Sequence, residues 1–510
     1  MTRLGFALLS DSCIGCHACT VACKSEHDVP LGVNRTWLKY IETGEFPNTG
    51  RSFSVMRCNH CDDAPCIEIC PTTALYRAPN GVVDFDDDRC IGCKSCMNAC
   101  PYDALYINPA TNTANKCNFC NHRVEVGLEP ACVVVCPTHA IVTGDLDDPT
   151  SEIARIVGRD QVAVRAPEQG TNPKVFYRGV DQAALDPTRT AIRTDGMIWA
   201  DTTPDHPTLT PTMEEHAGPG VVGRTAYTTA HPMTWKAKVS GYLVTKAIAA
   251  GLMLMAALLV TLGHADDRAA VGITPPVVAG LFTAITGVLL VADLKQPRRF
   301  LYILTRPNTS SWLVRGAWIL GAFAATVAAW GLFGIADTGG GIEVLALPAA
   351  LLAAAVAGYT AFLFGQCEGR DLWQTPLLLP TLLAQAVVAG GAAYGLLDLV
   401  LAVPEPKAIH IAFLGALGAL TLLIATELVS SGSRNVELAP VEMTRGRYAG
   451  QFWFGGVLTG LVVPALLLAL GLAVDDLGPW PAALAGVAAL SGLFAYEDAF
   501  VRAGQSVPLS

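Results

Sequence analysis

The stretch Cys-Ile-Gly-Cys-His-Ala-Cys-Thr-Val-Ala-Cys at 13–23 and the similar stretch Cys-Ile-Gly-Cys-Lys-Ser-Cys-Met-Asn-Ala-Cys-Pro at 90–101 decide the fold of the first third of this chain. Both have the spacing C-x2-C-x2-C-x3-C. Three closely spaced thiolates on a tight loop can wrap three irons of one [4Fe-4S] cubane. The fourth cysteine is expected to start a helix and to point toward a neighbouring cluster. The glycine of each Cys-Ile-Gly-Cys lets the backbone approach the cluster sulfides.

Sixteen of the seventeen cysteines fall into four groups of four, and Cys367 stands apart. The groups are Cys13, Cys16, Cys19 and Cys23; Cys58, Cys61, Cys66 and Cys70; Cys90, Cys93, Cys96 and Cys100; and Cys117, Cys120, Cys132 and Cys136. A two-cluster ferredoxin exchanges fourth cysteines between two groups. Four groups therefore predict two ferredoxin-like units and four [4Fe-4S] clusters. The regular C-x-x-C spacing argues against a secreted disulfide scaffold and against zinc ribbons.

The second half of the chain is mostly Ala, Leu, Gly and Val and predicts a membrane domain. Its apolar stretches are each close to the roughly twenty residues that cross ~30 Å of hydrocarbon. They run over 239–262, 273–292, 311–334, 343–366, 376–397, 408–430, 450–473 and 479–499. The expected fold class is an α+β ferredoxin-like double unit with four clusters, fused to an all-α bundle of about eight transmembrane helices.

The composition divides the chain into three parts. Residues 1–185 are expected to form the cluster domain, 186–234 an irregular linker, and 235–510 the membrane anchor. The linker is rich in Pro, Thr, Asp and Gly, and it either lies on the cluster domain or on a partner, or is a flexible tether. The net charge of -10, with no basic run, argues against a nucleic-acid partner.

Lysine and arginine next to the apolar stretches predict the orientation of the chain. The side of the membrane that carries the clusters has eleven such residues, and the other side has two. The eleven are Lys236, Lys238, Lys295, Arg298, Arg299, Arg306, Arg370, Arg434, Arg445, Arg447 and Arg502, and the two are Arg268 and Lys407. Met1–Phe6 has one Arg and a short apolar run, which predicts no signal peptide. We therefore expect a multi-pass protein of the inner (plasma) membrane, with the cluster domain and both termini facing the cytoplasm.

Polar residues inside the apolar stretches gather in the membrane half nearest the clusters. Tyr242 and Lys246 lie four residues apart on one helix face, Asp293 ends the second stretch, and Arg315 lies just inside the third. A buried ionisable residue in a membrane is costly and usually functional. A quinone head needs hydrogen-bond donors and a proton route, so these four residues are the predicted quinone site. Snorkelling to the membrane interface is the alternative for Lys246 and Arg315.

Further polar residues in the same half are Gln366, Glu427, Glu497 and Asp498. Glu427, Asp293 and Glu497 could form part of a proton path if the anchor coupled electron flow to pumping. No chain of such residues crosses the membrane, however, so quinone chemistry without pumping is the expectation. His410 lies near the opposite face and is not expected to contact quinone.

The cysteine pattern, with four residues between Cys61 and Cys66 and eleven between Cys120 and Cys132, resembles the four-cluster subunit of the dimethyl sulfoxide reductase and polysulfide reductase family. The resemblance implies that group one pairs with group four, and group two with group three. The four ligand sets would be Cys13, Cys16, Cys19 and Cys136; Cys117, Cys120, Cys132 and Cys23; Cys58, Cys61, Cys66 and Cys100; and Cys90, Cys93, Cys96 and Cys70. Spacing alone also allows pairing in sequence order. Residues 168–177 resemble the closing strand of that family.

The membrane half resembles the eight-helix anchor of polysulfide reductase type. The matching features include Gly241-Tyr242-Leu243, Asp293-Leu294, Gly369-Arg370-Asp371-Leu372-Trp373 and Arg502-Ala503-Gly504-Gln505. Anchor and cluster protein are usually separate chains in that family, and here they are fused. Lys246 stands where many relatives would have an uncharged residue.

Together the two resemblances imply an electron-transfer and anchor subunit that is not itself catalytic toward the primary substrate. It would exchange electrons between menaquinone or ubiquinone and a separate subunit with a bis-pterin molybdenum or tungsten cofactor. A cytoplasmic cluster domain favours a formate or sulfite dehydrogenase-like partner. The alternative is a quinol-oxidising complex, with or without proton translocation, that passes electrons to a cytochrome. The chain has no C-x-x-C-H, so any haem would belong to a partner.

Overall fold

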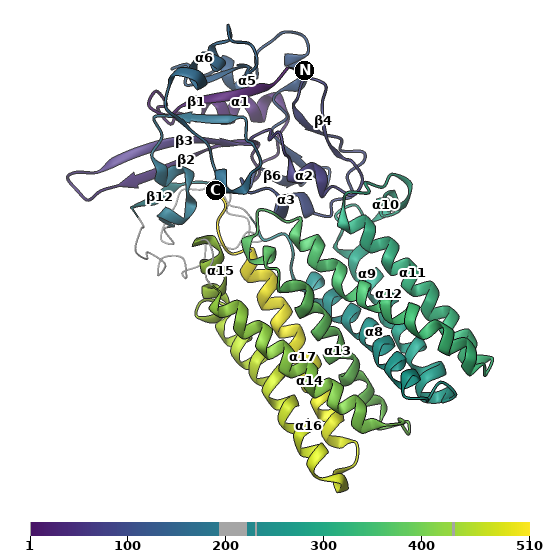
Figure 1. Ribbon diagram of the computed structural model, residues 1–510. Coiled ribbons are helices and arrows are strands. Elements are labelled where there is room, and N and C mark those ends of the chain that lie inside the picture. The colour runs from purple at the N-terminus through teal and green to yellow at the C-terminus, as the bar shows by residue number, and fades with distance from the viewer. Residues whose placement is uncertain (1, 193–221, 230–231, 431–433) are drawn as a thin grey trace.

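The computed structural model describes residues 2–192, 222–229, 232–430 and 434–510. A mixed domain of strands and short helices sits at one end of a bundle of long helices, and the C-terminus returns to the junction between them (Figure 1). The predicted fold class, an α+β domain fused to an all-α membrane bundle, is confirmed.

The first sheet covers the cysteine groups farthest from the helix bundle. Its strand order is β8 (Ile141–Asp145), β1 (Leu4–Leu9), β10 (Val175–Arg178) and β9 (Val162–Ala163). Strand β1 is antiparallel to β8 and parallel to β10. Phe6 and Leu8 point from β1 into a core that also holds Cys19 and Cys132. The closing strand expected within 168–177 is β10.

The second sheet has the order β11 (Thr190–Ile192), β12 (Gly223–Tyr227), β2 (Thr36–Thr43) and β3 (Gly50–Arg57). Strand β12 lies antiparallel to β2 and satisfies the backbone groups of its edge. The interpretation of 186–234 as irregular is therefore wrong at 190–192 and 223–227. These runs are too short to show a period of two in the sequence. Residues 193–221 lie outside the described part of the chain.

Short helices and two hairpins carry the cysteine groups. The hairpins are β4 (Leu75–Arg77) with β5 (Val83–Phe85), and β6 (Leu105–Asn108) with β7 (Thr113–Lys116). The helices are α1 (Ala18–Glu26), α2 (Pro65–Glu68), α3 (Ser95–Ala99), α4 (Asn121–Val124), α5 (Ala131–Val134), α6 (Glu152–Arg159) and α7 (Gln182–Leu185).

The helices of groups one and three start earlier than expected. Each begins one residue before the third cysteine, Cys19 or Cys96, and not at the fourth. The residues that precede them, His17 and Lys94, have positive φ angles of 61° and 65°. This backbone turn after the second cysteine sends the chain directly into the helix, so the third and fourth cysteines lie one turn apart.

All eight predicted membrane spans are confirmed among the described residues. They are α8 (Ala237–Thr261), η4 with α9 (Arg268–Asp293), α11 (Trp312–Ile335), α12 (Gly339–Gly365), α13 (Leu378–Leu397), α14 (Pro406–Val429), η7 with α16 (Gln451–Ala473) and α17 (Trp480–Gly504). The segments η4 (Arg268–Ile273) and η7 (Gln451–Val462) are π-helical. Shorter helices α10 (Tyr302–Thr305) and α15 (Arg434–Thr444) lie in the loops on the cluster side.

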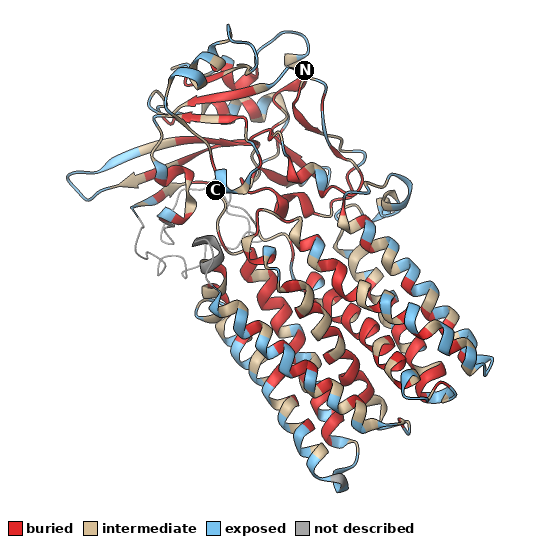
Figure 2. Ribbon diagram, in the orientation of Figure 1, coloured by how far each residue is buried: buried red, intermediate tan, exposed pale blue. Residues whose placement is uncertain are grey.

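Three helices form the centre of the bundle. In the apolar windows of α8, α13 and α17, 78%, 67% and 61% of residues are buried, against 22–33% in the other spans. Figure 2 shows exposed residues along the outer faces of α14 and α16, the surface available to lipid. Gly251 of α8 meets Gly390 of α13 backbone to backbone, and Gly395 of α13 meets Ala482 of α17. These small residues allow the close packing that apolar helices need in lipid.

Candidate iron–sulfur and quinone sites

Two cavities in the cluster domain are each lined by four cysteines. One is lined by Cys58, Cys61, Cys66 and Cys100, with Tyr102 and Leu105 among its other walls. The second is lined by Cys70, Cys90, Cys93 and Cys96. In both cavities, three cysteines come from one group and the fourth comes from its neighbour. The structure thus brings together groups two and three in the exchanged arrangement.

The other eight cysteines also mix two groups. Burial raises the pKa of the Cys13 thiol, and its cysteine neighbours Cys136 and Cys16 raise it further. Burial also raises the pKa of Cys23, a member of group one, and there Cys117, Cys132 and Cys120 of group four add to the effect. Cys19 has both Cys13 and Cys132 nearby, which places it between the two sets. Groups one and four therefore lie together.

The donor chemistry of these sets fits cubane clusters better than single ions. No three His, Cys, Asp or Glu side chains converge on one point in the described ranges, as a mononuclear site would require. A [4Fe-4S] cubane is wider, and its four thiolate ligands sit apart around its body. Four thiols around one cavity match that demand, and iron would hold as thiolates the groups that burial alone keeps protonated.

Two fully buried cations lie beside the cysteines, and sequence reasoning missed them. Arg57 is 3.5 Å from Cys132 Sγ, and its guanidinium lies 4.2 Å from the centre of the Phe6 ring. Lys116 donates to the carbonyls of Val83 and Cys117. Each cation directly precedes the first cysteine of its group, which is the signal that could have found them. A buried cation next to thiolates offsets the negative charge of a cluster.

The cavity of Cys70, Cys90, Cys93 and Cys96 is pressed against the membrane domain. Lys94 forms an ion pair of 2.7 Å with Asp293 at the end of α9. The Asn308 amide donates to the Cys70 carbonyl (2.9 Å), and Trp235 Nε1 donates to the Cys93 carbonyl (3.3 Å). This cysteine set is therefore held directly at the top of the helix bundle.

An aromatic stack continues from Trp235 into the helices. The centre of its ring lies 5.4 Å from that of Trp373 and 5.7 Å from that of Phe364, and the Phe364 and Trp373 rings are 4.7 Å apart. Thr360 precedes Phe364 by four residues on α12, so both lie on one helix face. The stack thus connects the Cys93 loop with the level of Thr360.

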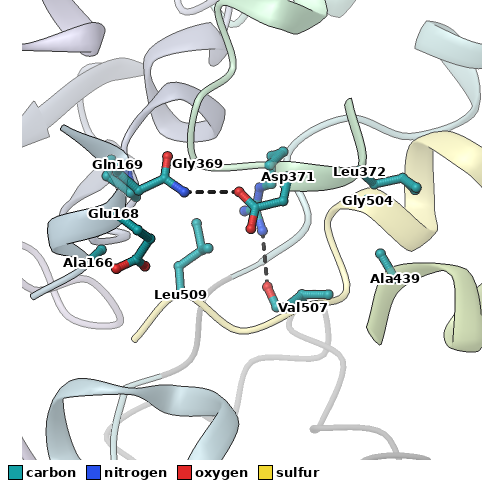
Figure 3. Close-up of a pocket in the computed structure, with 12 residues that line it drawn as sticks. Ala166, Glu168, Gln169, Gly369, Asp371, Leu372, Ala439, Gly504, Val507 and Leu509 are labelled. Carbon is teal, nitrogen blue, oxygen red and sulfur yellow. Dashed lines mark hydrogen bonds between the residues drawn. The ribbon is translucent and has the colours of Figure 1, made fainter. Parts of the chain in front are cut away.

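A second cavity at the junction lies between the cluster domain, α15 and the C-terminal tail (Figure 3). The Gln169 amide donates to the Asp371 carboxylate (3.0 Å), as the dashed line in the figure shows. Arg370 donates to the carbonyl of Val507 (3.2 Å). The Gln169–Asp371 bond joins the two domains, and the Arg370–Val507 bond holds the C-terminal tail at this junction.

Lys246 is fully enclosed by the helices and does not snorkel. Only 1% of the residue is exposed. Its ammonium donates to the Ala357 carbonyl (3.1 Å) and to the Thr360 hydroxyl, and it lies 4.7 Å from the centre of the Tyr359 ring. Tyr242 also faces Thr360, so Tyr242 and Lys246 share one polar neighbour, as their spacing predicted.

Two glutamates extend the polar cluster formed by Lys246, Thr360 and Tyr242. Glu497 of α17 is the acidic residue that faces Lys246, and it is 3% exposed. The Gln385 side chain of α13 also faces Glu497, and Glu427 of α14 interacts electrostatically with it. Gln385 was missed because a single amide within an apolar helix gives no sequence signal.

The other two predicted quinone residues lie elsewhere. Arg315 is exposed, donates to the Thr309 carbonyl (2.8 Å) and stacks on the Trp312 ring, so the snorkelling alternative holds for it. Asp293 is near enough to Tyr242 for an electrostatic interaction, but its carboxylate forms an ion pair with Lys94. The structure does not bring either residue to Lys246.

Comparison with known families matches both parts of the chain. The family described as a 4Fe-4S dicluster domain matches residues 51–146, and a 4Fe-4S binding domain matches residues 10–29. The family described as "Polysulphide reductase, NrfD" matches residues 226–508, which is more than half of the chain.

Individual relatives cover about a third of this chain and most of their own length. A tetrathionate reductase subunit of Salmonella typhimurium is 45% identical over 191 residues, which are 36% of this chain and 76% of the relative. The thiosulfate reductase electron transfer subunit PhsB of Salmonella typhi is 48% identical over 178 residues, 34% of this chain and 91% of the relative. The arsenate respiratory reductase iron-sulfur subunit ArrB of Shewanella sp. strain ANA-3 is 36% identical over 225 residues, 34% of this chain and 95% of the relative.

The matches fit the geometry, since four-cysteine sets fill the first domain and eight apolar helices the second. The chain is a multi-pass membrane protein that carries electrons through iron–sulfur clusters, and it belongs to the NrfD family of polysulphide reductase type, fused to a 4Fe-4S ferredoxin-like domain.

Proposed function

We propose that this chain passes electrons between the quinone pool and a separate catalytic subunit. The observation that carries the proposal is the contact between the cysteine set of Cys70, Cys90, Cys93 and Cys96 and the top of the helix bundle. One end of a row of clusters would thereby sit directly above the buried polar group around Lys246.

We assign the ligands of the four clusters by the thiols that lie together. The sets are Cys13, Cys16, Cys19 and Cys136; Cys117, Cys120, Cys132 and Cys23; Cys58, Cys61, Cys66 and Cys100; and Cys90, Cys93, Cys96 and Cys70. Pairing in sequence order would require Cys100 to leave the cavity that it shares with Cys58. We also extend the cluster domain beyond residue 185, to include β11 and β12.

The opposite end of the cluster domain is the proposed docking face for the catalytic subunit. Cys16 is exposed there, whereas Cys58 and Cys96 are buried. Ile14 and Val21, on either side of Cys16 in the sequence, are 58% and 64% exposed. This end lies away from the helices (Figure 1). An exposed apolar rim around an exposed ligand suits a protein partner that must bring its own redox group close.

The quinone head is proposed to react beside Tyr242 and Lys246. The hydroxyl of Tyr242 and the ammonium of Lys246 can donate to quinone oxygens from a low-dielectric site, where such donors act strongly. Asp293 instead holds Lys94 beside the cluster loop, and we omit it and Arg315 from the quinone site.

The names of the relatives favour one direction of electron flow. They are subunits of tetrathionate, thiosulfate and arsenate reductases. We therefore propose that this chain oxidises menaquinol or ubiquinol and supplies a reductase-type subunit with a bis-pterin molybdenum or tungsten cofactor. The preference for formate or sulfite oxidation finds no counterpart in these names. The excess of Lys and Arg at the cluster side supports a cytoplasmic cluster domain.

Metal analysis of the native complex, purified in mild detergent, tests this proposal. We expect about sixteen irons for this chain, plus those of its partner, and one molybdenum or tungsten. Iron accompanied by haem, with no molybdenum or tungsten, would contradict it and favour the quinol–cytochrome alternative.

A further inference from the structure

Three ionisable side chains from three helices interact electrostatically inside the membrane domain. Lys246 comes from α8, Glu497 from α17 and Glu427 from α14. Glu497 interacts electrostatically with Lys246, and Glu427 interacts electrostatically with Glu497. Lys246 and Glu497 are almost completely buried. Lys246 and Glu497 come near each other because α8 and α17 pack together at the centre of the bundle, and α14 packs on α13 beside them.

The other groups around these three are neutral or already paired. Tyr242 and Tyr359 lie at Lys246, and Tyr496 lies beside both glutamates. Asp498, the next residue after Glu497, is turned to Arg502 (2.7 Å), Ser240 (3.0 Å) and Gln451 (3.1 Å). No other charged group in the described ranges faces the three.

Two buried polar atoms on α13 and α14 have no hydrogen-bond partner in the part of the chain that the structure describes. They are the Thr381 hydroxyl and one Glu427 oxygen. Thr381 and Gln385 lie one turn apart on α13, and each is 2% exposed. Buried polar atoms nearly always have a partner. Water or a hydroxylated ligand beside α13 would supply the missing partner.

Charge balance leaves the group with a proton to exchange. Two carboxylates and one ammonium would carry one net negative charge in a low-dielectric interior, which is strongly unfavourable. One carboxyl must therefore hold a proton, shared between Glu427 and Glu497. All three side chains lie toward the cluster-side ends of their helices. At a rise of about 1.5 Å per residue, Glu427, Glu497 and Lys246 lie about 3, 10 and 14 Å from the cluster-side ends of their helices.

We propose that Glu497 and Glu427 form the proton route between the quinone site at Lys246 and the aqueous face on the cluster side. The inference rests on the proposed function. Oxidation of one quinol to quinone gives two electrons, which leave singly through the clusters to the catalytic partner, and two protons. Each proton passes to Glu497, then to Glu427, and then to water on the cluster side. Reduction of quinone runs the same steps in reverse and takes up both protons.

This route releases and takes up protons on one side of the membrane only. The three side chains lie in the half of the bundle next to the clusters, since α8 starts and α14 and α17 end there. Quinone turnover is then not coupled to proton transfer across the membrane by this chain.

Re-oxidation of the clusters by a quinone tests the route. The full chain, in lipid nanodiscs, is reduced with dithionite and mixed with menadione, and recovery of the visible cluster absorbance is followed from pH 6 to pH 9. We expect Glu497→Gln to slow recovery about a hundredfold, and Glu427→Gln about tenfold, because positioned acid–base groups contribute factors of this size. Both changes should alter the pH profile and leave the menadione concentration at half-maximal rate unchanged.

The matched control is Glu405→Gln, which removes an exposed carboxyl at the opposite end of α14. Its rate and pH profile should equal those of the wild type. Wild-type rates and pH profiles in Glu427→Gln would overturn the proton route alone, and this variant decides the matter if Glu497→Gln fails to keep its iron. No reaction of wild-type clusters with menadione would instead overturn the proposed function.

Discussion

The cluster domain and the membrane domain both bury charge, but they compensate it in different ways. In the cluster domain, Arg57 and Lys116 are held against cysteine sulfur and backbone carbonyls. In the membrane domain, Lys246 faces one glutamate that in turn faces a second. The first arrangement fixes positive charge beside groups that exchange electrons. The second leaves a carboxyl that can exchange a proton. Within one chain, the partners of the buried cations therefore differ between the region that transfers electrons and the region that transfers protons.

Loss of one cluster ligand should have the largest effect. Cys93→Ala removes a thiol from the cavity at the membrane junction. We expect iron to fall from about sixteen to about twelve per chain and menadione to lose its reaction with the remaining clusters. Iron analysis and cluster absorbance measure both results.

Cys367→Ala is the control, because Cys367 is buried close to Cys93 but lies in none of the four sets. Equal iron loss in the two variants would break the ligand assignment.

A substitution that forces two packed helices apart should have the second-largest effect. A Cβ on Gly251 would overlap the Ala386 carbonyl oxygen, so α8 and α13 would have to separate. We expect Gly251→Ala to destabilise the membrane domain by about 3 kcal/mol or more. Thermal unfolding in detergent, followed by helical circular dichroism, measures the change.

Gly287→Ala serves as its partner variant, since a Cβ there meets nothing within 4 Å. This variant should unfold at or slightly above the wild-type temperature. If both glycine variants were equally stable, close packing of α8 on α13 would not hold the bundle together.

The ion pair at the junction should have a smaller effect. Asp293→Asn leaves Lys94, whose side chain is 7% exposed, without its carboxylate. Because the Asp293 side chain is 20% exposed, we expect a cost of about 2 kcal/mol, less than for a fully buried pair. Hydrogen exchange of residues 90–100 and 289–296 should rise.

Arg315→Leu, at an exposed position, should change stability by less than about 0.5 kcal/mol and keep quinone turnover. Loss of quinone turnover in this variant would restore Arg315 to the quinone site.

The smallest effect should be a pH dependence within the cluster domain. Burial in β2 lowers the pKa of Lys39 to about 7, with Arg165 nearby adding to the shift and Asp186 opposing it. Between pH 7 and the usual lysine range, the unfolded chain binds more protons than the folded one, so stability rises with pH. Guanidinium should bleach the clusters more slowly at pH 9 than at pH 7. Lys39→Met should be more resistant at pH 7 and lose this slope, and an unchanged slope would contradict the assignment.

The spacing of the cysteines predicted four groups of four, and apolar length predicted the eight spans. Which groups pair was implied only by the resemblance to a known family. The sequence could not predict that β12 joins β2, since a five-residue strand without clear alternation gives no signal before its partner is known. The position along its helix placed each of Asp293 and Arg315 at the cluster side, but it did not indicate which residues their side chains contact. Which way a side chain points depends on helix rotation and packing.

The buried polar group was only partly predictable for the same reason. Lys246 and Glu497 stand out within apolar stretches, but their approach to each other depends on the contact between α8 and α17. Gln385 and Thr360 look like ordinary residues of apolar helices and gain meaning only beside Glu497 and Lys246.

We propose that electrons pass between the clusters and quinone beside Lys246, within this one chain. The most direct test is the menadione re-oxidation rate of dithionite-reduced Lys246→Leu, at equal iron content. We expect at least a hundredfold slower recovery of cluster absorbance, since the variant lacks the buried ammonium that positions the quinone and exchanges its proton. Recovery at the wild-type rate would show that quinone reacts elsewhere and would contradict a quinone site at Lys246.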